Sequence, residues 1–419
     1  MLGQLSFASG TTTWRECVSV LWSLLRLEPL KGGPWIQEYE RQFASYLKVK
    51  HAFSFAAGRM AFYAILKALG IGRGDEVILP GYTCAVVPTA VIYAGARPVY
   101  VDINPDNYNI DVTQVESKIT SRTKAILAQH TYGRPCDLEG LQAICDRHGL
   151  YMIEDGAHAL GATCKGRKVG SIGDAAFFSS EGTKTISTYA GGMVVTKDDD
   201  IADKLRTAYE ETSWLSRAQI LKMLLQLVAG NLFYHPRWSK LGQHVMGLWH
   251  RLRLAFTMDD CQQTSLPSGY PYPARLSNIQ AKIGLSQIIH MGGNLAHRRR
   301  LVQEYEKLFG KLSEDKSSLE WSVLRFPLKV SNQQEWSIKL SAVMARDVWF
   351  QPVLHGAKGD LAAYHYVAGS CPWAEQVAQQ MINFPTHLKV RLQDVSEIGD
   401  IVERSGLSVS IIEAQRVAR

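Results

Sequence analysis

Short, mostly apolar runs alternate with helical patterns between residue 52 and about residue 200. The runs that we predict as strands fall at 77–80, 99–102, 125–128, 151–154, 175–179 and 193–196. Between them, apolar residues recur at helical spacing over 58–69, 83–93 and 138–147. This alternation is typical of a mostly parallel sheet covered by helices. We therefore predict an α/β fold, with a three-layer α/β/α large domain and a sheet of about seven strands.

The pattern changes after residue 205. Residues 218–233 predict a helix whose polar residues Gln219, Lys222 and Gln226 form a thin stripe. A long helix is predicted over 276–308, then a strand near 324–330 and helices near 361–363 and 373–381, which together read as a small α+β domain. We expect four parts: an N-terminal helical segment (1–50), a large domain (51–205), an apolar and basic helical insertion (206–268), and the long helix with the small domain (269–419).

The N-terminal segment predicts two helices, over 18–27 and 36–47. In the first, Ser19, Ser23 and Arg26 recur at helical spacing and leave a wide apolar face. We favour packing of this face on the body of the protein or on a partner, with a membrane surface as the alternative. Charged residues interrupt the apolar run and no small-residue cleavage site follows, so we do not interpret it as a signal peptide.

Composition narrows the function classes only slightly. The formal net charge is +7 over 419 residues and is spread along the chain, which does not favour nucleic acid as a partner. The seven cysteines are scattered without a CxxC pair, so we predict neither a disulfide framework nor a metal site. A reducing cytoplasm fits this cysteine usage best.

Lys184 is the first candidate for chemistry. It follows the strand predicted over 175–179 and lies among small and hydroxyl residues, before the glycines at 191 and 192. A lysine at a strand exit can hold its amine against a carbonyl cofactor and form a Schiff base with it.

Two further groups fit the same cofactor. Asp155 ends a predicted strand, where open α/β sheets place ligands, and its carboxylate could hold a proton on a pyridine nitrogen; a cap of the following turn is the alternative.

Gly58 and Arg59 open a predicted helix, whose free N–H groups and positive dipole end suit a phosphate, and Ser179 could add a hydroxyl. Local backbone bonding is the alternative role of Ser179.

A series of motifs carries a family resemblance. They are Gly58, 78–83, 98–102, 130–133, Glu154 with Asp155, Phe178 with Ser179, Lys184, 191–193 and 275–281, in this order. The chain resembles the DegT/StrS family, whose members are pyridoxal-phosphate-dependent sugar aminotransferases of the aspartate aminotransferase fold (type I). The resemblance covers about residues 35–205 and 268–405.

The resemblance implies a role for each matching residue. Lys184 would carry pyridoxal 5'-phosphate covalently and then move the proton during transamination. Asp155 would pair with the pyridine nitrogen, Ala157 would pack on the ring, and His158 would reach the phenolic oxygen. Gly58, Arg59 and Ser179 would hold the phosphate. A homodimer is implied in the same way.

The chain departs from the family pattern at four places. Arg59 stands where Thr or Ser is common, and Cys84 where an aromatic residue often stacks on the ring, which leaves Tyr82 as the nearest aromatic candidate. Tyr189 and Ala190 replace the usual acidic residue before the paired glycines. Pro273 replaces an asparagine that reaches the partner subunit's cofactor, and proline has no side-chain donor.

Our leading hypothesis is an aminotransferase that aminates a keto-sugar, typically nucleotide-linked, with a glutamate-like donor, in surface polysaccharide or glycoconjugate synthesis. The alternative is a pyridoxal-phosphate protein of other chemistry, or a non-transaminating binding protein. Residues 214–256 contain tryptophans and basic residues that suit peripheral contact with a membrane, but we favour packing of their apolar face inside a dimer, with the membrane as the alternative. We expect a cytoplasmic protein, with contact to the inner membrane face and a lipid-linked substrate as further alternatives.

Overall fold

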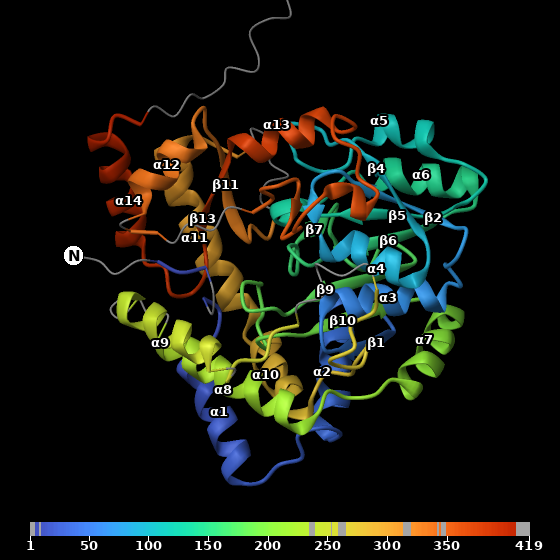
Figure 1. Ribbon diagram of the computed structural model, residues 1–419, viewed down its shortest axis with the longest axis horizontal. Helices are drawn as coiled ribbons and strands as arrows, with labels where there is room; N and C mark the ends of the chain where they lie inside the picture. The colour runs from blue at the N-terminus through green and yellow to red at the C-terminus, as the bar shows by residue number, and fades with distance from the viewer. Residues whose placement is uncertain are drawn as a thin grey trace, which may run out of the picture.

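A seven-stranded sheet forms the middle layer of the larger part of the molecule (Figure 1). The computed structural model describes residues 5–7, 10–233, 239–252, 254–258, 265–312, 320–341, 343–344 and 349–407. The strand order is β1 (His51–Phe55), β10 (Gly192–Thr196), β9 (Ala175–Ser179), β6 (Tyr151–Asp155), β5 (Thr123–Gln129), β2 (Glu76–Pro80) and β4 (Arg97–Val101). Within this sheet β10 runs antiparallel to its two neighbours, β1 and β9. All other neighbouring strands of the sheet are parallel.

Side chains of successive strand residues enter opposite cores, as the period of two requires. Phe177 packs in one core with helices α3 (Gly58–Ala68), α4 (Val86–Ala94) and α7 (Asp199–Glu211), whereas Phe178 packs in another with α2 (Pro34–Leu47) and α10 (Asn278–Ile289). On that second side of the sheet α6 (Leu138–His148) covers β5 and β6. The predicted three-layer α/β/α arrangement is confirmed.

The C-terminal part has its own core. Strand β11 (Arg325–Lys329) pairs antiparallel with β13 (Met381–Pro385), and these two strands pack with α11 (Met291–Phe309), α12 (Gln333–Leu340) and α14 (Leu392–Arg404). Phe326, Phe384 and Trp336 fill the space between them. Helix α13 (Pro372–Gln380) precedes β13. The sequence pattern predicted this helix but not the strand β13. This is the smaller α+β region expected.

Two element predictions are wrong in detail. The helix predicted over 276–308 is two helices, α10 and α11, which meet at His290 with φ −97° and ψ 12°. Gly292 and Gly293 follow directly, and paired glycines have a poor helix propensity. The helix predicted from residue 83 begins at Val86, because Thr83 and Cys84 form strand β3, which pairs with β12 (Leu354–His355) of the C-terminal part.

The N-terminal helix α1 (Trp14–Leu25) lies against the insertion helix α8 (Arg217–Phe233), which in turn contacts α9 (Ser239–Arg251), and the three appear together at the lower left of Figure 1. Helix α1 contacts α8 and α10 through its small and polar side: Cys17, Val20 and Ser23 are buried. Its large apolar side therefore faces outward and does not pack on the body of the chain, while packing on a partner stays a prediction. No described helix is both long and apolar enough to cross a bilayer. Trp238 and Arg253 of the predicted basic segment lie outside the described residues.

Candidate active site

A cavity of about 540 Å³ opens at the carboxyl ends of the parallel strands. Asp155 at the end of β6, Ser179 at the end of β9, and the loop with Lys184 form one side. Gly58 and Arg59 enter from the start of α3, and Met223 and Gln226 enter from α8. Of the predicted site residues, the cavity brings together Lys184, Asp155, Ala157, His158, Ser179, Gly58, Arg59 and Cys84.

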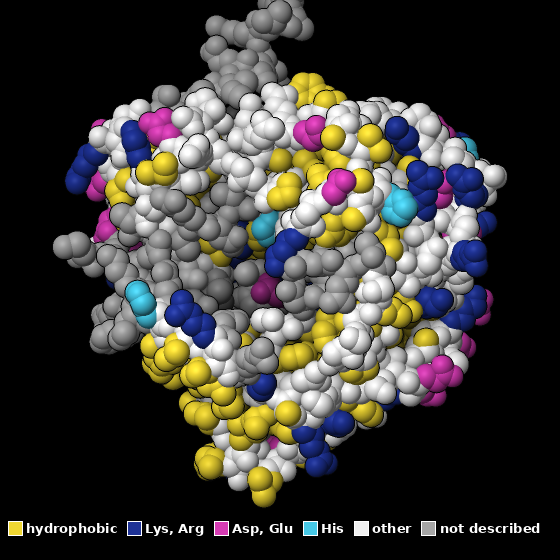
Figure 2. Space-filling view, viewed as in Figure 1, with side chains coloured by type: hydrophobic (Ala, Val, Ile, Leu, Met, Phe, Trp, Pro, Cys, Tyr) yellow, Lys and Arg dark blue, Asp and Glu magenta, His cyan; other side chains and the backbone are white. Residues whose placement is uncertain are grey.

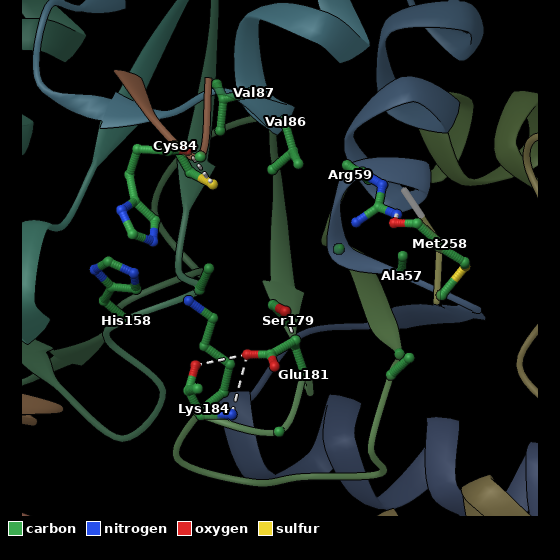
Figure 3. Close-up of a pocket in the computed structure, with 18 of the residues that line it drawn as sticks. Ala57, Arg59, Cys84, Val86, Val87, His158, Ser179, Glu181, Lys184 and Met258 are labelled. Atoms are coloured by element: carbon green, nitrogen blue, oxygen red, sulfur yellow. Dashed lines mark hydrogen bonds between the residues drawn. The ribbon is translucent and has the colours of Figure 1, made fainter. Parts of the chain in front are cut away.

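Lys184 extends its amine toward His158 in the cavity (Figure 3). The Nζ atom lies 4.4 Å from the centroid of the Trp349 ring, which is a cation–π distance. Burial lowers the pKa of Lys184 below its ordinary value, and the nearby Arg325 acts in the same direction. A lowered pKa leaves more of the amine unprotonated near neutral pH, which is the form that attacks a carbonyl carbon.

The backbone around Lys184 is held by buried polar side chains. Thr11 Oγ1 donates to the Lys184 carbonyl oxygen at 2.8 Å, and Asn294 Nδ2 donates to the Thr185 carbonyl oxygen at 2.7 Å. Arg298 joins these two contacts, because its Nη2 donates to Thr11 Oγ1 at 3.1 Å and its Nε to Asn294 Oδ1 at 2.9 Å. Further along, Gln280 Nε2 donates to the Ala190 carbonyl oxygen at 2.7 Å.

Asp155 lies at the cavity floor with its side chain buried. Burial raises the pKa of Asp155 to about 6, and a hydrogen bond from the Ala157 backbone N–H to Oδ1 (3.0 Å) partly opposes the rise. A cation close to this carboxylate would favour its ionised form. The turn-capping role that we considered is present as well, since the Ala157 bond is of that kind.

His158 presents a ring nitrogen without a partner. Its ring stacks on Trp349, with centroids 4.5 Å apart and planes 12° from parallel. Its Nδ1 is buried and has no hydrogen-bond partner among the described residues. Burial, together with the charges of Lys184 and Arg325, lowers the pKa of His158 well below 6.5, so the imidazole is neutral and one ring nitrogen can donate while the other accepts.

Helix α3 begins at the cavity wall with no side chain capping its first N–H groups. A Cβ atom on Gly58 would come within 2.9 Å of Ser179 Cβ, so glycine is needed for this close approach. The Arg59 guanidinium also faces the cavity, and its Nη2 donates to the Met258 carbonyl oxygen at 2.8 Å (Figure 3). A helix N-terminus beside an arginine is a suitable seat for an anion.

Tyr82 does not line the cavity, contrary to the prediction that it would stack on a ring there. It is fully buried, its hydroxyl lies 2.9 Å from that of Tyr132, and its ring lies 4.5 Å from the Phe350 ring. Cys84, two residues on, lines the cavity instead.

Several lining residues were missed. They come from the C-terminal part and from the insertion: Trp349, Phe350, His355, Met223, Gln226, Phe256 and Met258. The pairing of β3 with β12 brings His355 beside Cys84. No local pattern marks these residues, because only long-range packing brings them to the strand ends.

The donor set fits pyridoxal phosphate group by group. A buried amine can meet an aldehyde, a carboxylate can meet a protonated ring nitrogen, an unpartnered imidazole nitrogen can meet a hydroxyl, and a helix N-terminus with an arginine can meet a phosphate.

The fold is that of the type I pyridoxal-phosphate transferases. The structure of NtdA from Bacillus subtilis, determined with bound PMP, superposes with a TM-score of 0.71 at 22% identity and covers 95% of this chain and 83% of that chain.

The chain belongs to the DegT/DnrJ/EryC1/StrS aminotransferase family, whose model matches residues 16–403. It is 32% identical over 394 residues to GDP-perosamine synthase of Caulobacter vibrioides, with 91% of each chain covered. It is 30% identical over 371 residues to UDP-N-acetyl-3-dehydro-alpha-D-glucosamine 3-aminotransferase of Acidithiobacillus ferrooxidans, with 87% of each chain covered. The predicted family, fold, enzyme class and cofactor are confirmed.

Proposed function

We propose that this aminotransferase moves an amino group from a glutamate-like donor to the keto group of a nucleotide-linked sugar, in the synthesis of a surface polysaccharide or glycoconjugate. The observation that carries this proposal is the meeting of Lys184, Asp155 and His158 in one cavity at the strand ends. The named relatives from Caulobacter vibrioides and Acidithiobacillus ferrooxidans, which act on GDP- and UDP-linked sugars by their names, support the substrate class.

Each residue has one task in this proposal. Lys184 would hold the cofactor through Nζ and would serve as the base and acid that carries the proton in transamination. Asp155 keeps a proton on the pyridine nitrogen, and His158 binds the phenolic oxygen through its unpartnered Nδ1. When bound, pyridoxal phosphate supplies the electron sink that makes the proton removable.

The phosphate is assigned to the start of α3. Gly58 permits the close approach of the backbone, Arg59 adds a positive charge, and Ser179 adds a hydroxyl. Ala157 packs on one face of the ring, and Cys84 lines the cavity where relatives of the family often have an aromatic residue. We include the homodimer and the cytoplasmic location in the proposal. The peripheral membrane contact of residues 214–256 belongs to it as well.

The glutamate half-reaction tests this function. Purified protein is loaded with pyridoxal phosphate and mixed with glutamate, and the absorbance of the lysine-bound cofactor is followed as it converts to that of pyridoxamine phosphate. We then supply GDP-, UDP- and dTDP-linked keto-sugars and expect one class to restore the first spectrum. No conversion with glutamate, glutamine or any other amino acid would contradict the proposal and favour the non-transaminating alternative.

A further inference from the structure

Helix α1 has its amphipathic pattern reversed. Trp14, Leu25 and Leu27 are 58%, 74% and 88% exposed, whereas Glu16 and Ser23 are buried. Glu16 completes a capping box with Thr13, and the Ser23 hydroxyl lies between Lys282 Nζ at 2.9 Å and Glu28 Oε2 at 3.1 Å. The polar side of the helix is thus fixed against the body of the protein, and the apolar side is left outside.

Exposed apolar side chains also occur on α8, which contacts α1, and on α9 and the residues just after it, which contact or follow α8. We call this surface the α1–α8–α9 face; its large exposed apolar residues are Trp14, Val18, Leu21, Trp22, Leu25, Leu27, Leu221, Leu225, Leu232, Leu248, Leu252 and Leu254. Figure 2 shows hydrophobic side chains gathered at the lower left, over α1 and α8. Exposed apolar patches of this kind mark interaction sites.

The charges on this face have one sign. Residues 212–258 contain no Asp or Glu, although the chain has 39 acidic residues, and they include Arg217, Lys222 and Arg251. Helix α1 adds the exposed Arg15 and Arg26, and the Arg26 guanidinium lies 4.8 Å above the Trp22 ring. Exposed tryptophans beside arginines and lysines are the side chains that prefer the headgroup region of a bilayer.

We propose that the α1–α8–α9 face docks on the surface of an anionic lipid bilayer, with its apolar side chains in the headgroup region and its cations on lipid phosphates. A second copy of the chain fits less well, because a symmetric pair would bring the same acid-free, cationic face against itself. An anionic bilayer supplies both the missing negative charge and the apolar layer. This inference rests on the membrane contact of residues 214–256 in the proposed function and adds α1 to it; it does not depend on which sugar is aminated.

Flotation of the full-length holoenzyme with vesicles tests the proposal. One set of vesicles is phosphatidylcholine alone and the other contains about 30 mol% phosphatidylglycerol, a fraction that gives a clear negative surface potential. We expect recovery with the anionic vesicles and much less with the neutral ones. Trp22→Gln with Leu25→Gln should weaken binding by about tenfold or more, since two large apolar anchors are lost. Arg26→Gln with Arg217→Gln should weaken binding to the anionic vesicles alone, without altering packed residues.

The matched control is Trp373→Gln, which removes a tryptophan that is 46% exposed on α13, away from the face. It should leave flotation unchanged. No binding of the parent protein, equal recovery from the two kinds of vesicle, or equal recovery of all variants would overturn the proposal. A halved molecular mass in the Trp22→Gln and Leu25→Gln double variant, measured by light scattering, would instead make the face a contact between copies and overturn it.

Discussion

Residues 184–190 and the α1–α8–α9 face depart in opposite directions from the usual distribution of polar and apolar side chains. Around 184–190, polar groups are buried and bonded: Thr11, Asn294 and Gln280 donate to backbone carbonyl oxygens of this segment. On the face, tryptophan and leucine side chains are exposed. Buried polar networks fix one geometry because each unpaired group would be costly, whereas exposed apolar area is costly only until something covers it. The first region holds atoms in place and the second is suited to contact.

The largest effect on activity is expected for a substitution of Lys184, the first residue of the segment 184–190. Lys184→Ala removes the amine that we assign to cofactor attachment and proton transfer, so the glutamate half-reaction should slow by at least about 10⁴-fold. The absorbance of lysine-bound cofactor should be absent. Stopped-flow absorbance measures both, and a Lys184→Ala protein that still showed this band would contradict the assignment of Lys184.

Asp155→Asn tests the other charged group. Asparagine keeps the size but not the negative charge, so the pyridine nitrogen would lose the partner that holds its proton, and the half-reaction should slow by about 10²-fold or more. The rate constant with glutamate is the measurement. A value within threefold of the parent would mean that Asp155 only caps the turn at Ala157.

Arg298→Met tests the network behind Lys184. Its guanidinium is buried, burial lowers the pKa of Arg298 to about 9, and it donates to Thr11, Asn294, Thr386 and the Leu324 carbonyl oxygen. Leaving these groups without their donor should lower the free energy of unfolding by about 3 kcal/mol, measured by urea denaturation. Arg300→Met, an exposed arginine on the same helix, is the control and should change it by less than about 0.5 kcal/mol. Equal losses in the free energy of unfolding from the two substitutions would show that the hydrogen bonds of Arg298 do not stabilise the fold.

His387, which lies close to Arg298, makes the stability of the fold depend on pH. Its Nε2 lies 2.8 Å from the Ser6 carbonyl oxygen, and burial, with the charge of Arg298, lowers the pKa of His387 to about 3. The unfolded chain takes up this proton near pH 6.5 and the folded chain does not, so stability falls as the pH drops below 6.5 and is unaffected above it. With His387→Gln, the stability lost between pH 7.5 and pH 5 should shrink by about 2 kcal/mol. Urea midpoints at the two pH values measure this, and an unchanged difference would contradict it.

The smallest effect is expected when exposed residues of the α1–α8–α9 face are replaced and the stability of the protein is measured. Trp22→Gln with Leu25→Gln should leave the melting temperature and the half-reaction rate essentially unchanged, with a stability change within about 0.5 kcal/mol, because neither side chain is buried. Differential scanning calorimetry makes the measurement. A loss of more than about 2 kcal/mol would show that these residues support the fold, and the contrast between the two regions would fail.

The sequence was sufficient for the parts of the site that follow strand ends. Asp155 and Ser179 are the last residues of β-strands, Lys184 follows a strand by five residues, and Gly58 opens a helix, so local pattern was enough to find them. The same reasoning could not separate Tyr82 from Cys84, because residues two apart share a face of an extended segment, and only the distant Tyr132 and Phe350 hold Tyr82 away from the cavity. Trp349 and Gln226 were out of reach, since both come from distant parts of the chain.

The orientation of α1 shows a second limit. Periodicity gives the existence of a polar and an apolar side but not the direction each faces. The polar side turned inward because Ser23 could join the Lys282–Glu28 pair, a contact 259 residues away along the chain. The break at His290 was missed for a simpler reason, since apolar periodicity continues through the two helices while the backbone does not.

The hydrogen bonds that the first described residues make affect the order in which the chain folds during synthesis. Ser6 and Thr11 leave the ribosome well before their partners His387 and Arg298, which are synthesised 381 and 287 residues later. Contacts of such long sequence separation close late and slowly in folding. The bond from Thr11 to the Lys184 carbonyl oxygen spans 173 residues, but Arg298 can support Thr11 only after residue 298 has been synthesised. Until Arg298 and His387 have been synthesised, the nascent enzyme has its lysine but lacks the full support that positions it.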